Sequence, residues 1–320
     1  MKTLVTGSSG HLGEALCARL VADGHEARGL DLLPGTSTTH RGSIIDPDFV
    51  ERSMRGVEAV FHAATLHKPH VATHGEQAFI DVNLTGALNV LKASARAGVG
   101  AFVFTSTTSV FGDALTPEKG APAAWIDEDV VPKPKNIYGV TKAAAEDLCA
   151  LFARNHKLSV IVLRTSRFFP EADDDPSRAA AYPDANLKLN EFLYRRVAIE
   201  DAVEAHLLAA AKAPALGFRR YVVSATTPFG REDLAELALD APAVLRRKIP
   251  AYEAAYARLG WRLFPTLDRV YVNERARVDL GWRPRDDFAT VLARVNDGGS
   301  VLGPIAAKIG AKGYHRTAPP

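Results

Sequence analysis

The sequence is poor in cysteine and in long apolar runs, and each shortage excludes a class of protein. Cys17 and Cys149 are the only cysteines, too few for a disulfide framework. Both fall in helical patterns among apolar residues, which predicts buried free thiols. No stretch of about 20 apolar residues is present, so we expect no transmembrane helix. The chain opens on a strand-like segment rather than on a signal peptide, and we predict a cytoplasmic protein with no membrane partner.

An excess of charge of one sign is also missing. The 39 Lys and Arg residues nearly balance the 37 Asp and Glu residues, which leaves a formal net charge of +2. No lysine- or arginine-rich run is present, so we predict no nucleic-acid partner. What remains is a chain of 320 residues, 47% of them hydrophobic. That is enough for a full core in one large domain or in two intimate ones.

The most informative segment is glycine-rich and reads TLVTGSSGHLG at residues 3–13. An apolar run precedes the glycines, and a helical pattern follows them at once. Because Gly7, Gly10 and Gly13 lack a Cβ, the backbone can turn sharply and a pyrophosphate can approach the first helical turn. Unpaired N–H groups and the helix dipole favour an anion there. The segment therefore predicts a dinucleotide site.

A carboxylate follows the glycine turn by about twenty residues, at the end of the next predicted strand. Asp31 at this place would bind the adenosine ribose hydroxyls of NAD and repel the extra phosphate of NADP. Leu32 and Leu33 come next and offer no positive charge, whereas Arg28 and Arg41 are near enough in sequence to favour NADP. We predict NAD, and the alternative for Asp31 is a solvated turn residue.

Strand-like and helical segments alternate through the first half of the chain. This alternation predicts an α/β fold, a Rossmann-type doubly wound parallel sheet with helices on both faces. The predicted strands are 1–7, 25–32, 57–64, 101–107, 158–166 and 219–225, with 42–46 as a candidate short third strand. The main predicted helices are 14–24, 48–56, 79–98 and 138–156, with another in the segment 195–213.

The second half predicts a smaller, mostly helical substrate region over the carboxyl ends of the strands. We expect residues 1–166, with 191–226 returning to them, to form the NAD-binding domain, and residues 167–190 and 227–296 to form the substrate region. The stretch 167–190 is acidic and interrupted by proline, which predicts a loop rather than a core element. Residues 297–320 are rich in glycine and proline and predict a loosely held tail.

Tyr138 and Lys142 stand four residues apart at the start of a strong helical pattern, so both side chains lie on one face. A tyrosine with a pKa of about 10 is a poor base at pH 7. A nearby ammonium group and the positive charge of an oxidised nicotinamide would lower that pKa. Tyr138 would then take a proton from a substrate hydroxyl while a hydride leaves the same carbon. The alternative is an exposed helix pair.

The segment FVFTSTTSVFG at 102–112 ends a predicted strand with several hydroxyl groups. Ligands bind beyond the carboxyl ends of the strands in a doubly wound sheet. A hydroxyl there can therefore hold the reacting oxygen beside Tyr138. The alternative is a threonine-rich strand edge.

Together these segments resemble the extended short-chain dehydrogenase/reductases, the group that includes NAD-dependent sugar epimerases and dehydratases, from residue 1 to about 290. TGSSGHLG is similar to the family's T-G-x-x-G-x-x-G, and ERARVDLGWRP to its C-terminal L-G-W-x-P. TSTTSVFG resembles S-S-x-x-V-Y-G, which implies that Thr107 is the catalytic hydroxyl. Tyr138 and Lys142 match the family's base and its helper.

The resemblance implies that NAD contacts the glycine turn, the following strand ends and the catalytic helix. The candidate cofactor-binding residues are Gly7, Ser9, Gly10, His11, Leu12, Gly13, Asp31, Ser43, Ile44, Ala63, Ala64, Thr65, Asn83, Thr105, Tyr138, Lys142 and Arg167. The candidate substrate residues are Lys68, His70, Thr107, Thr108, Arg167 and Arg195.

The three histidines of the segment LHKPHVATH suggest a metal-binding site. A metal site needs ligands that converge from a fixed scaffold with further support behind them. Pro69 and the loop-like composition argue against such a scaffold. We therefore predict no metal and assign His67, Lys68 and His70 to the substrate pocket.

The resemblance implies an NAD-dependent epimerase or dehydrogenase that acts by hydride transfer on a secondary hydroxyl of a sugar or nucleotide sugar. Dehydration is not expected, because Thr108 and Ser109 stand where sugar dehydratases carry an Asp-Glu pair. Two alternatives remain open: an NAD(P)-dependent dehydrogenase or ketoreductase of a non-nucleotide small molecule, and a non-catalytic dinucleotide-sensing regulator. Alanine- and leucine-rich stripes on helices 78–98 and 138–155 predict a homodimer.

Overall fold

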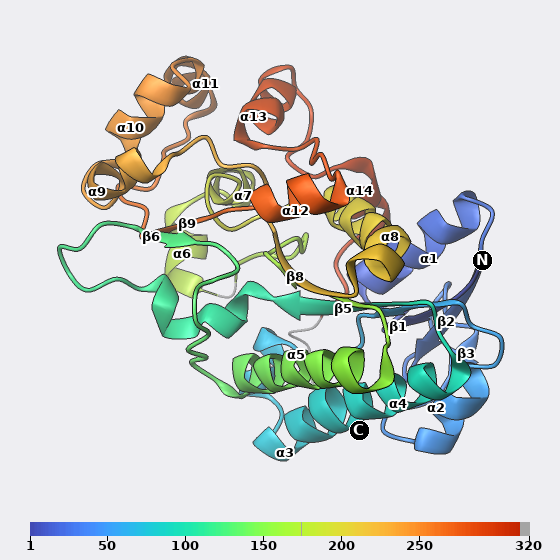
Figure 1. The fold of residues 1–320 in the computed structure, drawn as a ribbon. Helices are drawn as coiled ribbons and strands as arrows, with labels where there is room; N and C mark the ends of the chain where they lie inside the picture. Colours follow the sequence, from blue (N-terminus) through green and yellow to red (C-terminus); the bar gives the residue numbers. More distant parts are fainter. Residues whose placement is uncertain (174, 314–320) are drawn as a thin grey trace.

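The computed structural model describes residues 1–173 and 175–313, and these form a doubly wound α/β fold (Figure 1). Parallel strands form one sheet in the order β3-β2-β1-β4-β5-β7-β8. Their bounds are β1 (Lys2–Thr6), β2 (Glu26–Asp31), β3 (His40–Arg41), β4 (Ala59–His62), β5 (Ala101–Thr107), β7 (Val160–Thr165) and β8 (Phe218–Val223). The predicted Rossmann-type sheet is confirmed.

Helices cover both faces of this sheet, because successive strand residues point to opposite sides. Alternate strand residues such as Val5 and Phe61 pack against α1 (His11–Ala22) and α8 (Ile199–Leu216). Their neighbours Leu4 and Val60 pack on the other side. That face is covered by α2 (Pro47–Ser53), α4 (Ala87–Ala97) and α5 (Ile137–His156). Apolar strands covered on both faces explain the nearly continuous hydrophobic runs in the sequence.

The helix expected at 79–98 has an irregular first half. A short helix α3 (Glu76–Phe79) continues into a π-helical turn, Ile80–Gly86, before α4 begins. π-helical turns often occur at functional sites. Here the π turn carries Asn83, which is buried beside the loop that follows β4.

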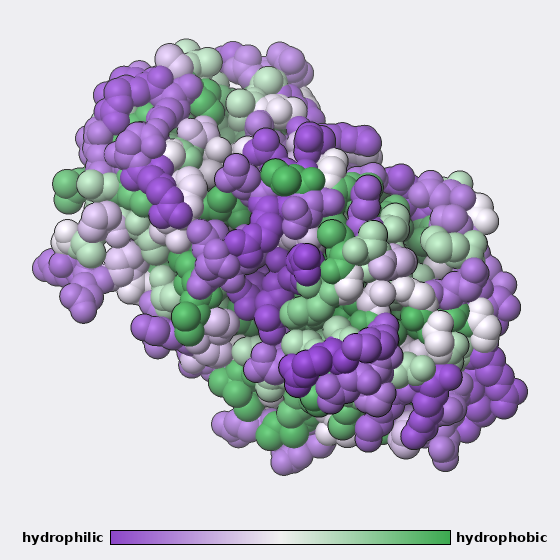
Figure 2. Space-filling model, in the orientation of Figure 1, coloured by the Kyte–Doolittle hydropathy of each residue, from purple (hydrophilic) through white to green (hydrophobic). Residues whose placement is uncertain are grey.

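A second, mostly helical region has its own core. It contains α6 (Pro176–Ala181), α7 (Asp184–Glu191), α9 (Leu234–Leu237), α10 (Ala241–Lys248), α11 (Ala251–Leu259) and α13 (Phe288–Asn296). A two-stranded parallel sheet of β6 (Ala124–Ile126) and β9 (Arg269–Tyr271) belongs to the same part of the molecule. Hydrophilic residues cover most of its outer face around α9–α11 (Figure 2). The residue bounds proposed for the two domains remain a proposal.

The expectation of a loop over 167–190 is wrong from Pro176 onward, because α6 and α7 are helices there and most of α7 is buried. The polar residues of α7 were expected to face solvent, but in the structure they form hydrogen bonds with other parts of the chain. Asn186 and Asn190 each donate to the Arg262 carbonyl at 3.0 Å, and Asn186 also accepts the Arg262 N–H. Buried amides of this kind are stable only when they are hydrogen-bonded.

Two further expectations are corrected. The third strand is His40–Arg41 rather than 42–46, since the chain turns at Ser43 and Asp46 then caps α2 through the N–H groups of Asp48 and Phe49. The tail is not loosely held over 301–313: Val301 and Ala306 are buried, and α14 (Pro304–Ile309) packs on α1 and α8. Residues 314–320 lie outside the described residues.

Two expectations from composition can be compared with the fold. Cys17 and Cys149 are buried free thiols, as expected. Within the described chain, no helix has the length and apolar character needed to cross a membrane.

Candidate active site

The glycine turn joins β1 to α1 through backbone contacts that leave no room for side chains. Gly7 has φ +77°, and a Cβ there would lie 2.7 Å from the Ala64 nitrogen. A Cβ on Gly13 would lie 2.0 Å from the Gly7 carbonyl oxygen. Gly10 caps α1 without a side-chain hydrogen bond, so the first N–H groups of the helix have no cap. This uncapped cradle fits a diphosphate.

Asp31 ends β2 beside the same turn. Its carboxylate accepts the N–H groups of Ser9 and Leu33, both at 2.9 Å. Arg28 donates to the carbonyls of Ser53 and Arg55, and the Arg41 Nε donates to the carbonyl of Leu32. Both arginines are therefore engaged with backbone, and Asp31 lines the cavity whereas Arg28 and Arg41 do not.

Asn83 holds the loop after β4 rather than facing the cavity. Its amide oxygen accepts the N–H of Leu66 at 2.8 Å and the hydroxyl of Thr65 at 2.9 Å. Its amide nitrogen donates to the Leu66 carbonyl and to the Thr141 hydroxyl. Asn83 thereby fixes Thr65 against α5, and its role here is to position a cavity-lining loop.

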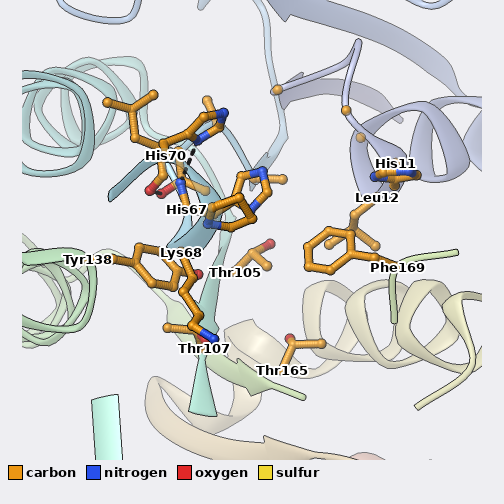
Figure 3. Close-up of a pocket in the computed structure, with 18 of the residues that line it drawn as sticks. His11, Leu12, His67, Lys68, His70, Thr105, Thr107, Tyr138, Thr165 and Phe169 are labelled. Atoms are coloured by element: carbon orange, nitrogen blue, oxygen red, sulfur yellow. Dashed lines mark hydrogen bonds between the residues drawn. The ribbon is translucent and has the colours of Figure 1, made fainter. Parts of the chain in front are cut away.

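Tyr138 lies in the first turn of α5. Asn136 precedes this helix and caps it, since its side chain accepts the Gly139 N–H. Tyr138 and Thr107, the last residue of β5, line the same cavity (Figure 3). Burial raises the pKa of Tyr138 to about 12, and the influence of Thr107 only partly opposes this. The lowering of this pKa by Lys142 and an oxidised nicotinamide stays a prediction.

Lys142 lies behind the cavity wall. Its side chain is buried, Nζ donates to the Thr105 carbonyl at 2.6 Å, and Nζ lies 4.0 Å from the centre of the Phe104 ring. Burial lowers the pKa of Lys142 to about 7, against the opposing effects of Cys149 and Glu146.

A buried ion-pair network fixes α5 against the strands. Glu146, one turn after Lys142, accepts the Ser106 hydroxyl at 2.6 Å and the Arg164 guanidinium at 2.9 Å. Arg220 also donates to it. Ser106 stands between Thr105 and Thr107, so the network holds the strand end in register with Tyr138. The sequence signal for Glu146 is its place four residues after Lys142, and sequence reasoning missed it.

One cavity of about 1110 Å³ brings the predicted residues together at the carboxyl ends of the strands. It exceeds the range of about 300–1,000 Å³ typical of a site for one small ligand, so a dinucleotide and a substrate can share it. All the predicted cofactor and substrate residues line it except Asn83 and Lys142. Residues that sequence reasoning missed also line it: Phe168, Phe169, Glu171, Arg269, Tyr271 and Lys312.

The arginines predicted to contact substrate are joined to buried carboxylates. Arg195 pairs with Asp173 at 2.9 Å and with Glu191 at 2.6 Å, and Arg167 lies 3.6 Å from Asp173. Arg196 also pairs with Glu191. Burial alone would raise the pKa of Glu191, but the arginines outweigh it and hold this pKa at about 2. Much of the positive charge is therefore already neutralised within the protein.

The histidines near the cavity mouth contact one another and an aromatic ring. The His67 N–H donates to Nδ1 of His70 at 3.0 Å, and the His67 ring stacks on Phe169 at 5.4 Å (Figure 3). Across residues 1–173 and 175–313, no group of three or more His, Cys, Asp or Glu side chains is arranged to hold a metal ion.

This geometry can be compared with known proteins. Residues 3–224 match the family model described as the NAD dependent epimerase/dehydratase family. The chain belongs to this family. The match spans the glycine turn, Asp31, Thr107, Tyr138 and Lys142, and the family consists of NAD-dependent enzymes, which agrees with the predicted fold and cofactor.

Similar proteins differ in how much of this chain they align with. A 2-alkyl-3-oxoalkanoate reductase of Stenotrophomonas maltophilia is 30% identical over 92% of this chain and 98% of its own length. A UDP-glucose 4-epimerase of Streptomyces lividans is also 30% identical, but over only 50% of each protein.

Solved structures share the fold at lower identity. A short-chain dehydrogenase/reductase superfamily protein from Agrobacterium tumefaciens with bound NAD has a TM-score of 0.67 and 23% identity, covering 93% of this chain and 96% of its own. The Thermus thermophilus UDP-glucose 4-epimerase complex with NAD has a TM-score of 0.63 and 24% identity, covering 93% of this chain and 98% of its own.

Proposed function

We propose that this family member interconverts a secondary alcohol and a ketone with NAD as cofactor, and that Tyr138 gives and takes the proton. The observation that carries the proposal is that Tyr138 and Thr107 line the same cavity as the glycine turn. A proton-transfer group and a dinucleotide cradle then face one space. The regulator alternative is disfavoured, because nothing has replaced the tyrosine.

The residues have separate roles in this proposal. NAD, when bound, supplies or accepts the hydride. Tyr138 donates its proton to the carbonyl oxygen during reduction and takes it back during oxidation. The Thr107 hydroxyl holds the same oxygen, and Lys142 fixes the strand end through the Thr105 carbonyl. Burial raises the pKa of Tyr138, so the phenol is protonated at neutral pH and can act as the proton donor in reduction.

We propose a small carbonyl substrate without a nucleotide. A nucleotide diphosphate needs free positive charge, whereas Asp173 and Glu191 already pair with Arg195. The end-to-end similarity to a 2-alkyl-3-oxoalkanoate reductase supports the same class. The apolar rings of Phe168 and Phe169 on the cavity wall suit an alkyl group.

A sugar or nucleotide sugar is the second candidate. It is supported by the half-length similarity to a UDP-glucose 4-epimerase. Polar side chains on the cavity wall, Lys68, Thr108 and Asn136, suit sugar hydroxyls. In that case the ketone would be an intermediate, and the net reaction would be epimerisation or oxidation.

The test is a substrate screen of the purified protein, followed through NADH absorbance. A set of 3-oxo acids is offered with NADH, and UDP-sugars are offered with NAD, with sugar products separated by chromatography. We expect NADH oxidation with the oxo acids and none with UDP-sugars. Turnover of UDP-sugars alone would favour the second candidate. Absence of any turnover by a protein that binds NAD would contradict both.

We also propose that the protein is a homodimer. The helices α4 and α5 lie side by side on one face of the sheet (Figure 1). On and beside them, Ile80, Val140 and Leu151 are exposed by 37%, 49% and 36%. Pairing of this face with a second copy would bury these residues in a four-helix interface.

A further inference from the structure

The C-terminal segment of the described chain runs back to the start of the fold. After α13 it passes Val301 and forms α14, which packs between α1 and α8 (Figure 1). Glu200, at the start of α8, accepts the N–H of Ile305 at 2.7 Å. Gly303 lies so close to this carboxylate that a Cβ would sit 2.4 Å from an oxygen. The segment is therefore anchored on the face that carries the glycine turn.

Beyond α14 the same segment reaches the dinucleotide end of the cavity. Lys312 and Gly313 line the cavity together with Gly10, His11 and Glu14. The Lys312 backbone N–H donates to Glu171 at 2.7 Å, and the Lys312 ammonium pairs with Glu14. A residue from the end of the described chain thus meets the first turn of the first helix.

Two carboxylates border the place where a diphosphate fits. Glu14 is in the first turn of α1, and the Glu171 side chain is 9% exposed with His11 at 3.0 Å. The pKa of Glu171 falls to about 2: burial alone would raise it, but hydrogen bonds from His11 and Lys312 outweigh burial. Both carboxylates would repel a diphosphate a few ångströms away in a partly buried site.

We propose that Lys312 is a cofactor-binding residue: it neutralises Glu14 so that the diphosphate of NAD can bind at the first turn of α1. Residues 304–313 cover that end of the site and place the Lys312 ammonium group there. The helix N-terminus supplies N–H groups, and Lys312 supplies the positive charge that the glycine turn lacks. The inference rests on NAD as the cofactor and is independent of the substrate proposed above.

The matched variants are Lys312→Met, Glu14→Gln and the double variant, with Lys308→Met as the control. Lys308 is exposed on α14 and does not line the cavity. Glu14→Gln keeps an oxygen for the Thr36 hydroxyl that already bonds there. The ligands are NAD and adenosine, because adenosine has no phosphate. Each Kd is measured by titration calorimetry on the full chain, at low and at high salt.

We expect Lys312→Met to weaken NAD binding about tenfold, which corresponds to one lost charge interaction. Adenosine binding and the control variant should stay within about twofold of wild type. The loss should shrink at high salt. Adding Glu14→Gln should restore most of the NAD affinity, because the repelling carboxylate is then gone.

Either of two results would overturn the inference. One is unchanged NAD affinity in Lys312→Met, and the other is an equal loss of adenosine and NAD affinity, which indicates a merely structural role. Circular dichroism of each variant checks that it is folded. Because the readout is binding, a failed substrate screen leaves this test intact.

Discussion

The Tyr138–Thr107 pair is the smallest unit on which the proposed reaction depends. Tyr138→Phe keeps the ring and removes only the proton-transfer group. We expect kcat to fall by about 10²- to 10⁴-fold, the usual contribution of acid–base catalysis, with NAD affinity nearly unchanged. Steady-state kinetics and NAD titration measure the two quantities. Tyr182→Phe is the control, since Tyr182 packs on Phe264 in the helical region. Wild-type turnover by Tyr138→Phe would refute the role.

Lys142 makes stability depend on pH. Its pKa of about 7 in the fold lies below its ordinary 10.5, so the unfolded chain binds more protons between these values and stability rises with pH there. A protonated Lys142 therefore destabilises the fold, and Lys142→Met removes this destabilisation. We expect the variant to be inactive yet more stable, with an advantage that is greatest below pH 7. The advantage should shrink by up to about 1.4 kcal/mol per pH unit towards 10.5. Urea unfolding from pH 6 to 10 measures it, and a constant difference would contradict the burial argument.

Short local patterns made half of the site predictable from the sequence. The glycine turn, Asp31 and the Tyr138/Lys142 spacing each lie within one strand–turn–helix unit, so their geometry follows from local structure. Glu171 and Lys312 could not be found in this way. They meet α1 from segments about 160 and 300 residues away in the chain, and no local pattern marks them. The burial of Tyr138, which raises its pKa, depends on packing and could not be predicted from local sequence either.

At the scale of elements, α7 is held by charge rather than by apolar contact alone. Glu191 at its end pairs with Arg195 and Arg196, and its pKa lies near 2. Glu191→Gln leaves these arginines uncompensated in a buried place. We expect unfolding free energy at pH 7 to fall by about 3–5 kcal/mol. Because the folded pKa is below the ordinary 4.5, this stabilisation is full above pH 4.5 and is lost as pH falls towards 2.

Denaturant unfolding at pH 7 and in acid tests this prediction. The difference in unfolding free energy between wild type and Glu191→Gln should decrease as the pH is lowered. The control is Glu236→Gln, which breaks an exposed pair with Arg247 and should change stability little. Equal losses in the two variants would mean that burial of the pair is unimportant.

The same helix shows why secondary structure in the substrate region resisted prediction. Residues 184–191 read DANLKLNE, a polar segment after two prolines. Asn186 and Asn190 can be buried because their side-chain amides hydrogen-bond to the backbone of Arg262, over 70 residues away in the chain. The strands of the sheet were predictable, because a strand that is buried on both faces consists almost entirely of apolar residues. A helix whose buried face is polar leaves no such pattern.

At the scale of the whole molecule, the cavity lies where the two regions meet. The sheet contributes the carboxyl ends of β1, β2, β4, β5 and β7, and the helical region contributes Arg269 and Tyr271. We therefore propose that the first region holds the cofactor and that the second selects the substrate. This division explains why the family was recognisable from residues 3–224 while the substrate was not.

The free face of α4 and α5 gives the last prediction. Val140 is 49% exposed beside Tyr138, in the first turns of α5. If two copies pair through this face, Val140→Glu places two like charges near the dimer axis and should shift the protein to monomer. Light scattering at micromolar concentration should give twice the 34.4 kDa chain mass for wild type and the chain mass for the variant. Val131→Glu, at a valine 69% exposed outside these helices, should remain dimeric. A monomeric wild type would remove the proposal.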